Sequence, residues 1–212
     1  LNVTPVNDRP LISASFTQQT VQYSDPIQPV TVTASDVDNA YDQLLLSMAW
    51  KEASQSAFTP GLPPDVQLTE GPGNSFPKQW TLSGNINLPK GTYIFRMTVT
   101  DGDPDLLTNS AYTDLEIIVT PEDARITFTG VFMATTASTS SSTVVVPLSA
   151  LIKGGAAGTN NPDNTPGDIR NARVTFTIVE TGQTIGPLTP ELGSPDDPST
   201  GTVRTDWMVD LG

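Results

Sequence analysis

The sequence contains neither cysteine nor histidine. The absence of cysteine excludes a small scaffold held by disulfides, and 212 residues are enough for two domains with cores of their own. The absence of histidine removes Ser-His-Asp and Cys-His catalytic arrangements together with the usual zinc ligands. The absence of histidine therefore argues against an enzyme.

Basic residues are scarce, because 10 lysines and arginines stand against 23 aspartates and glutamates, and both halves of the chain are acidic. A negative surface repels phosphate backbones and anionic lipids, so the charge argues against nucleic-acid binding and favours attraction of cations. The other interpretation of the same charge is solubility. No apolar run approaches the roughly 20 residues of a membrane helix, which argues against membrane insertion.

Apolar and polar residues alternate with a period of two in many segments of the chain. In GTYIFRMTVT, residues 91–100, Tyr93, Phe95, Met97 and Val99 fall on one face. Similar runs occur in both halves, and 19 prolines and 16 glycines lie mostly between them. The sequence therefore predicts an all-β fold of tandem antiparallel β-sandwiches, with about seven strands before Pro121 as in immunoglobulin-like domains.

The phrase VTPVND at residues 3–8 returns as VTPED at residues 119–123. Each phrase contains a proline, which ends strand pairing, and carries acidic residues, as expected at a joint between modules. We therefore predict one β-sandwich over residues 1–121 and a second over residues 122–212. The second is short for a full copy, so it is either a smaller domain or one that stops before its last strands. We expect the whole to be a piece of a longer protein.

Carboxylates of the first half cluster in three loops. Asp8 lies in the first joint, Asp36 and Asp38 follow a predicted strand in SDVDNAYD, and Asp101 and Asp103 follow another in TDGDPD. Calcium takes about six to eight oxygen ligands from side chains and turn carbonyls, so these loops are candidate ligand sources if they meet in space. Neither loop matches an EF-hand. The other interpretation is turn chemistry, because Asp and Asn side chains bond to their own backbone in turns.

The phrases VNDRP, ASDVDN and VTDGDPD resemble the acidic motifs of the cadherin-like, dystroglycan-type repeats of large bacterial surface and secreted proteins. GLPPDVQL, WTLSGNI and GTYIFRMTVTDGD resemble the same family, so the likeness covers most of residues 1–121. The resemblance implies seven-stranded sandwiches joined end to end, with calcium at the joints. The glutamates that animal cadherins contribute from early strands have no counterpart here. The positions that match the family's calcium ligands are Asn7, Asp8, Asp36, Asp38, Asp101 and Asp103.

In the second half, EDARITFTG, GDIRNARVTFTIVETG and STGTVRTDWMVDLG resemble another immunoglobulin-like module of long bacterial extracellular proteins. That module usually continues for several more strands. The resemblance thus implies a second immunoglobulin-like β-sandwich, truncated at its C-terminus.

Two further classes of site need features that the sequence alone does not supply. Glycoside hydrolysis needs two carboxyl groups facing each other in one cleft. Sugar stacking needs exposed aromatic rings, and the candidates are Trp50, Trp80 and Trp207. Alternation places Trp80 on one face with Leu82, and Trp207 on one face with Val203, which favours core packing for both tryptophans.

Taken together, these patterns indicate a non-catalytic structural or adhesion segment of a bacterial surface protein, located outside the cell or on its surface. The expected partners are neighbouring modules of the same long chain and a surface protein or glycan, with no nucleic acid and no membrane insertion. The alternative is a carbohydrate- or ligand-binding accessory module of a secreted enzyme.

Overall fold

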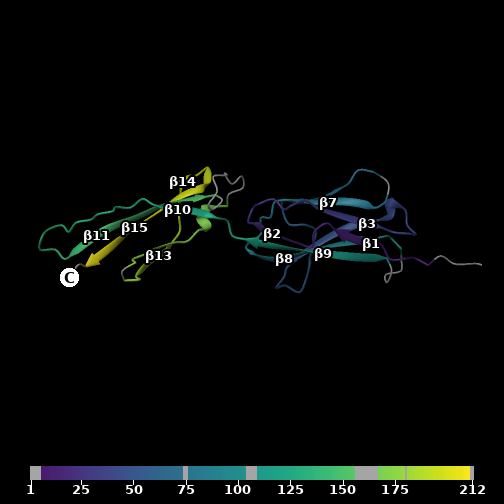
Figure 1. The fold of residues 1–212 in the computed structure, drawn as a ribbon, viewed down its shortest axis with the longest axis horizontal. Helices are drawn as coiled ribbons and strands as arrows, with labels where there is room; N and C mark the ends of the chain where they lie inside the picture. The colour runs from purple at the N-terminus through teal and green to yellow at the C-terminus, as the bar shows by residue number, and fades with distance from the viewer. Residues whose placement is uncertain (1–5, 74–75, 104–108, 156–166, 180, 211–212) are drawn as a thin grey trace, which may run out of the picture. The chain divides into compact units, whose positions relative to one another are not determined.

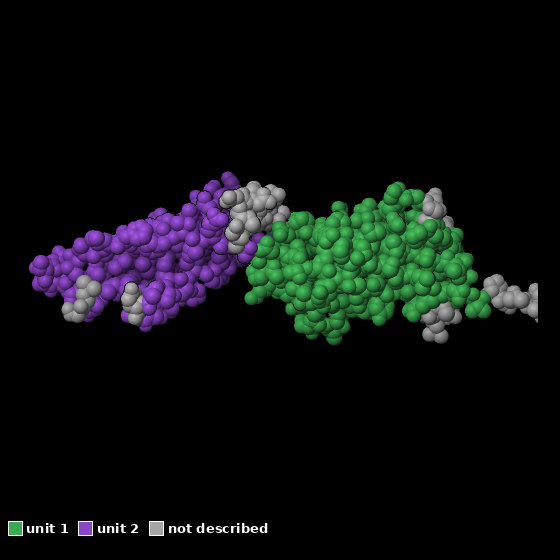
Figure 2. All heavy atoms as spheres, in the orientation of Figure 1, with its two compact units in different colours: residues 1–121 green, residues 122–212 purple. Residues whose placement is uncertain are grey.

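The computed structural model describes residues 6–73, 76–103, 109–155, 167–179 and 181–210. These residues form strands and two three-residue 3-10 helices, which confirms the predicted all-β sandwich fold. Neither of these short helices comes near the length or apolarity that crossing a membrane requires. The chain divides into two compact units, Leu1–Pro121 and Glu122–Gly212 (Figures 1 and 2).

Unit 1 consists of two facing sheets (Figure 1). The first has four strands in the order β1 (Leu11–Ala14), β3 (Val30–Ser35), β7 (Lys78–Gly84) and β6 (Val66–Glu70). The second has five strands in the order β2 (Gln18–Gln22), β9 (Ser110–Thr120), β8 (Gly91–Thr100), β4 (Leu45–Glu52) and β5 (Thr59–Pro60). This is the strand order of an immunoglobulin-like sandwich, with the first strand divided between the two sheets.

The core of unit 1 lies between these sheets and follows the alternation of the sequence. Phe95, Met97 and Val99 on β8 are fully buried, and they face Val32 and Leu82 from the other sheet within one hydrophobic cluster. Burying each large side chain stabilises the fold by about 1.5 to 3 kcal/mol relative to exposing it. Strand β4 begins at Leu45, because the residues before it, Tyr41–Gln43, form the 3-10 helix η1.

The short link between β1 and β2, residues 15–17, carries the chain from one sheet to the other. Ser15 donates its N–H to the carbonyl of Thr31 on β3 at 2.9 Å, and its hydroxyl accepts the Thr31 N–H at 3.0 Å. Two residues later, the carbonyl of Thr17 accepts the N–H of Glu116 on β9 at 2.9 Å. Strand β2 then pairs in parallel with β9, whereas the other strand pairs of unit 1 in the described residues are antiparallel.

Unit 2 repeats part of this topology. Its four-stranded sheet has the order β10 (Ala124–Phe128), β11 (Thr143–Gly154), β15 (Asp197–Asp210) and β14 (Glu191–Ser194). The facing layer is an antiparallel pair, β12 (Val174–Thr177) and β13 (Thr184–Leu188), preceded by the 3-10 helix η2 (Ile169–Asn171). In chain order this matches β1-β3-β7-β6 with the pair β4–β5 opposite. The buried core is small and consists of Ala150, Ile152, Ile169, Val174 and Val203.

Candidate functional site

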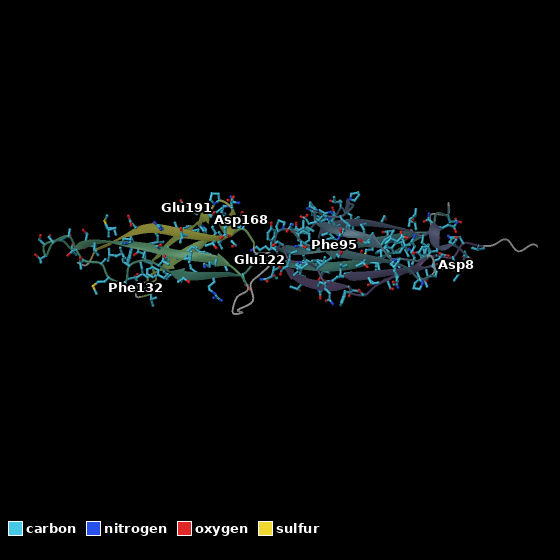
Figure 3. All side chains as sticks on the ribbon, turned by 90° about the horizontal axis from the view of Figure 1, so that it is seen from above. Asp8, Phe95, Glu122, Phe132, Asp168 and Glu191 are labelled. Atoms are coloured by element: carbon cyan, nitrogen blue, oxygen red, sulfur yellow. The ribbon has the colours of Figure 1, made fainter. Side chains whose placement is uncertain are left out.

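All six residues predicted as calcium ligands lie at one end of unit 1. Strands β3 and β8 belong to facing sheets but end on the same side, so the loops that follow them meet. The segment before β1 enters the unit there, and Figure 3 shows Asp8 at this end. We call the six residues together with Asn39 the acidic cluster, and its members are Asn7, Asp8, Asp36, Asp38, Asn39, Asp101 and Asp103.

Hydrogen bonds connect the entering segment to both loops. The Asn7 side chain donates from Nδ2 to Asp101 Oδ2 at 3.0 Å, and the Asp8 backbone N–H donates to Asp38 Oδ2 at 2.7 Å. The two loops are joined by Asn39, whose Nδ2 donates to the Asp101 carbonyl at 3.3 Å. The acidic cluster is therefore one hydrogen-bonded network.

Turn chemistry accounts for one oxygen of each loop's first aspartate. Asp36 Oδ1 accepts the N–H groups of Asp38 at 2.8 Å and Asn39 at 3.2 Å, and Asp101 Oδ1 accepts the Asp103 N–H at 2.8 Å. An aspartate that binds the backbone N–H two residues on fixes a tight turn. Turn formation by these two aspartates thus accounts for the backbone hydrogen bonds of both loops.

The donor set of the acidic cluster consists of carboxylate and amide oxygens, which suits a hard cation such as calcium. Within the part of the chain that the structure describes, no three acidic side chains are arranged so that they could hold a metal ion. One oxygen is nevertheless unused: Asp36 Oδ2 is shielded from solvent and accepts no hydrogen bond among the described residues. A buried carboxylate oxygen without a partner costs stability unless a donor or cation reaches it. In donor chemistry the cluster therefore fits calcium, although among the described residues its carboxylates do not converge on one point.

Asn39 was not among the predicted ligands, although the quoted phrase ASDVDN contains it. A second residue that sequence analysis missed is Lys78, which is only 4% exposed. Its Nζ donates to the Leu44 carbonyl at 3.0 Å and pairs with Glu70 at 3.1 Å, and it lies 4.7 Å from the ring centre of Tyr41 and 5.3 Å from that of Trp80. Lys78 follows Pro77 directly, and the turn residues before it gave no indication that strand β7 begins at Lys78.

The tryptophans of unit 1 pack inward and form no exposed pair. Trp80 is buried, and Trp50 packs against the core with its ring 6.1 Å from that of Tyr93. Tyr112 is exposed on the outer face of the second sheet, but the Arg96 guanidinium covers its ring at 4.0 Å. These rings therefore offer no open stacking platform for a sugar.

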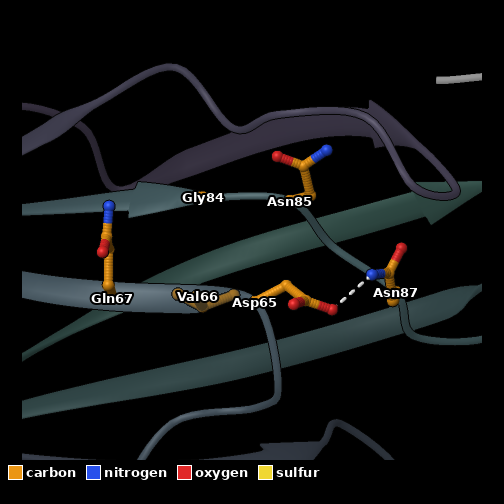
Figure 4. Close-up of a pocket in the computed structure, with 6 residues that line it drawn as sticks. All are labelled: Asp65, Val66, Gln67, Gly84, Asn85 and Asn87. Carbon is orange, nitrogen blue, oxygen red and sulfur yellow. Dashed lines mark hydrogen bonds between the residues drawn. The ribbon is translucent and has the colours of Figure 1, made fainter.

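A polar groove lies beside β6 and β7 (Figure 4). Two hydrogen bonds to Asp65 hold its lining residues together, from Asn87 Nδ2 to Asp65 Oδ2 at 2.7 Å and from the Asn85 N–H to the Asp65 carbonyl at 3.1 Å. No aromatic ring lines it, so it lacks the stacking surface that the carbohydrate-binding alternative requires. The lining residues are Asp65, Val66, Gln67, Gly84, Asn85 and Asn87.

No protein-family model and no curated protein matches the sequence. Similar solved structures include a chain from work on the structural basis of T cell specificity and activation by the bacterial superantigen toxic shock syndrome toxin-1, and a structure of murine CRIg. The first is 12% identical with a TM-score of 0.36 and covers 52% of this chain and 99% of its own. The second is 12% identical with a TM-score of 0.31 and covers 54% and 99%. At these scores the likeness carries no argument about function.

Proposed function

We propose that this chain is a non-catalytic structural segment of a large extracellular bacterial protein, in which cadherin-like and immunoglobulin-like modules in series extend or present something at the cell surface. Its partners are the neighbouring modules of the same chain. The two units with matching strand order support this proposal, because repeated sandwiches are the usual way to build an extended chain of domains.

The observation that carries the proposal is the parallel pairing of β2 with β9, in which Gln18–Gln22 lies against residues 116–120. Strand β2 lies near the start of unit 1 and β9 at its end. A force that separates the two ends of the unit pulls β2 toward its N-terminus and β9 toward its C-terminus. Because the strands are parallel, the two pulls act along the strands in opposite directions. The hydrogen bonds between them are then loaded in shear and share the load, instead of opening one after another. Such an arrangement suits a module that carries tension.

The proposed role does not use the acidic residues as catalysts. The chain has no histidine or cysteine, and three carboxylates of the acidic cluster, those of Asp36, Asp38 and Asp101, accept hydrogen bonds from backbone and amide N–H groups. These bonds fix loops at one end of the sandwich, which is a structural task.

The finer proposal is that the acidic cluster binds calcium through Asn7, Asp8, Asp36, Asp38, Asp101 and Asp103. Support comes from the oxygen donor set, the unpartnered Asp36 Oδ2 and the acidic charge of the chain. A bound calcium ion supplies positive charge that offsets the mutual repulsion of these carboxylates. The residues would then hold the entering segment more firmly against the two loops.

Thermal unfolding in EDTA and in 1 mM calcium tests the calcium proposal. A dissociation constant of about 10 µM would give about 2.7 kcal/mol of stabilisation at 1 mM, because only the folded state binds. Asp36→Asn keeps the oxygen that closes the turn but replaces the unpartnered one with an amide, so it should abolish the calcium effect. Glu52→Gln removes one charge at the far end of β4 and should leave the effect intact.

Identical unfolding curves in EDTA and calcium would rule out the calcium site and leave turn chemistry as the role of the cluster. The proposed resistance to tension is tested separately, by measuring the force needed to unfold unit 1.

A further inference from the structure

Exposed apolar side chains of unit 1 gather at the end that carries the acidic cluster. Val6 directly precedes Asn7, whose side chain bonds to the loop after β8. Val37 lies between Asp36 and Asp38 in the loop after β3. Both valines therefore lie next to members of the acidic cluster.

Three further apolar residues lie where strands begin at this end. Leu11 on β1 pairs with the last residue of β3, and Leu45 on β4 pairs with the last residue of β8. Phe76 precedes β7, and its ring centre lies 6.0 Å from that of Tyr41 in η1, the helix that follows the loop after β3. We call these residues the apolar rim, and its members are Val6, Leu11, Val37, Leu45 and Phe76.

The exposure of the apolar rim sets it apart from the other apolar residues of unit 1. Its members are between 40% and 80% exposed. Among the described residues of unit 1, the one other exposed large hydrophobic side chain is Tyr112, and the Arg96 guanidinium covers its ring. Exposed apolar side chains gathered in one region mark a surface that binds another molecule.

The charge at the same end indicates the chemistry of that molecule. The acidic cluster contributes its aspartate carboxylates here. Two described cations lie beside them: Arg9, whose Nε donates to the Ser110 carbonyl, and Lys78, which is already paired with Glu70. The surface therefore stays negative, and a cationic side chain is its complement. Apolar neighbours that exclude water strengthen the attraction between such a cation and the carboxylates.

We propose that the apolar rim and the acidic cluster form a docking surface for a separate protein, whose contact segment presents arginine side chains between apolar ones. Arginine suits this surface because its planar guanidinium binds a carboxylate through two parallel hydrogen bonds. The apolar neighbours of the arginines pack on Val37 and Phe76. The docking surface depends neither on calcium binding nor on the resistance of unit 1 to tension.

A second copy of the chain fits this surface less well. The net charge of the chain is −13, and both units are acidic, so two copies repel each other as they approach. The negative charge of the docking surface adds to this repulsion. A different protein with a basic contact segment is therefore the better complement.

An NMR titration in EDTA tests the proposal with a defined probe, the peptide acetyl-Leu-Arg-Leu-Arg-Leu-amide. We expect the backbone amide signals of Val6, Val37 and Gly102 to shift as the peptide is added to the isotope-labelled chain, while the signals of unit 2 stay in place. The same peptide with citrulline in place of both arginines keeps the shape but lacks the charge. It should bind about tenfold more weakly, because hydrogen bonds to carboxylates are stronger from a charged donor.

A substitution separates apolar contact from charge attraction. Val37→Ser should weaken binding of the arginine peptide about threefold or more, because the leucines of the peptide lose an apolar partner. Val179→Ser in unit 2 is the matched control, since Val179 is 88% exposed and Val37 is 80% exposed. It should leave peptide binding unchanged. Both variants should fold normally, because neither valine belongs to a hydrophobic core cluster.

Absence of any shift at millimolar peptide would overturn the proposal, as would equal binding of the arginine and citrulline peptides. Equal binding by the Val37→Ser chain would reduce the contact to charge attraction and would also overturn it. A Val37 signal that shifts with protein concentration, together with a dimer in sedimentation, would assign the surface to a second copy. Because EDTA removes calcium, these outcomes are independent of the thermal unfolding test of the calcium site.

Discussion

Asn7 and Asp101 lie 94 positions apart in the sequence, yet Asn7 Nδ2 donates a 3.0 Å hydrogen bond to Asp101 Oδ2, on a residue that is only 2% exposed. This bond fastens the segment before β1 to the loop after β8. Because the carboxylate is buried, the bond replaces hydration that Asp101 has lost.

Replacing Asn7 with alanine should destabilise unit 1 by about 1 to 3 kcal/mol, because a buried carboxylate oxygen loses its side-chain donor. Asn87→Ala is the matched control, since Asn87 makes the same kind of bond to exposed Asp65. It should cost about 0.5 kcal/mol or less. Chemical denaturation of both variants measures the difference, and equal losses would contradict a special role for the buried bond.

Pulling unit 1 by its ends should show a resisting force that depends on the β2–β9 ladder. The Thr17 carbonyl and the Tyr23 N–H both bond to β9, so alternation directs the Val21 N–H toward β9 and the Thr20 N–H away from it. Val21→Pro removes a ladder bond worth about 0.5 to 1.5 kcal/mol and should lower the peak unfolding force. Single-molecule force spectroscopy measures this force, with Thr20→Pro as the control that should keep it. A peak force that both prolines leave unchanged would refute the proposed resistance to tension.

Lys78→Met should destabilise unit 1 by about 1 to 3 kcal/mol. The methionine fills a similar space but leaves the Leu44 carbonyl without its 3.0 Å donor. Lys90→Met, at an exposed position, should change the unfolding free energy by about 0.5 kcal/mol at most. If denaturant melts give the two variants the same stability, the buried amine contributes nothing beyond its volume.

The stability of unit 2 should fall in acid through Asp168. Hydrogen bonds from the Arg170 side chain and then from its backbone N–H hold the pKa of this carboxyl below its usual value. Because the folded-state pKa is lower than the unfolded one, the stabilisation is present above the unfolded pKa, about 3.9, and is lost as pH falls through the folded pKa. Melting temperatures measured from pH 7 downward should show this loss, and Asp168→Asn should weaken it.

A titration of the Asp168 carboxyl by carbon NMR gives the direct check. A midpoint at or above that of an unfolded peptide would contradict the prediction. The effect matters for the core of unit 2, because Asp168 caps η2 through a 2.9 Å bond from the Arg170 N–H and η2 carries buried Ile169.

Much of the fold of unit 1 could be predicted from alternation alone. Tyr93, Phe95, Met97 and Val99 are buried on one face of β8, as expected from a strand with one apolar side. The division of the first strand between two sheets could not be predicted, since β2 reads QQTVQ and has a single buried residue, Val21. Its position depends on pairing with β9, nearly a hundred residues away, which local sequence does not encode.

The acidic loops were located correctly because turn residues at strand ends are a local signal. Whether they bind calcium stays a prediction, since the cation's geometry depends on how Asp36 and Asp101 are oriented by residues from other segments. Lys78 was missed because the residues just before it predict a turn and because its burial results from contacts with Tyr41 and Leu44, which lie far from it in sequence.

The burial of the tryptophans could be predicted only in part from the alternation of apolar and polar residues. Trp80 is buried as predicted, and Val203 is buried in unit 2 as its alternation indicates. Trp207 was expected in the core beside Val203 but is only partly buried. Alternation identifies which face of a strand is apolar, and it says nothing about whether a second layer covers that face along its whole length.

The link at residues 15–17 connects the two sheets of unit 1 near its N-terminus. Ser15 bonds to one sheet and Thr17 to the other. A protease that cut this link would separate β1 from the rest of the chain, so that β1 would be retained only by its ladder with β3, while β2 would become the first strand of the remaining chain. Shortened versions of the protein should therefore begin before Leu11, because a start within β2 removes edge strands from both layers at once. A recombinant version of the module should therefore keep β1 and β2 together.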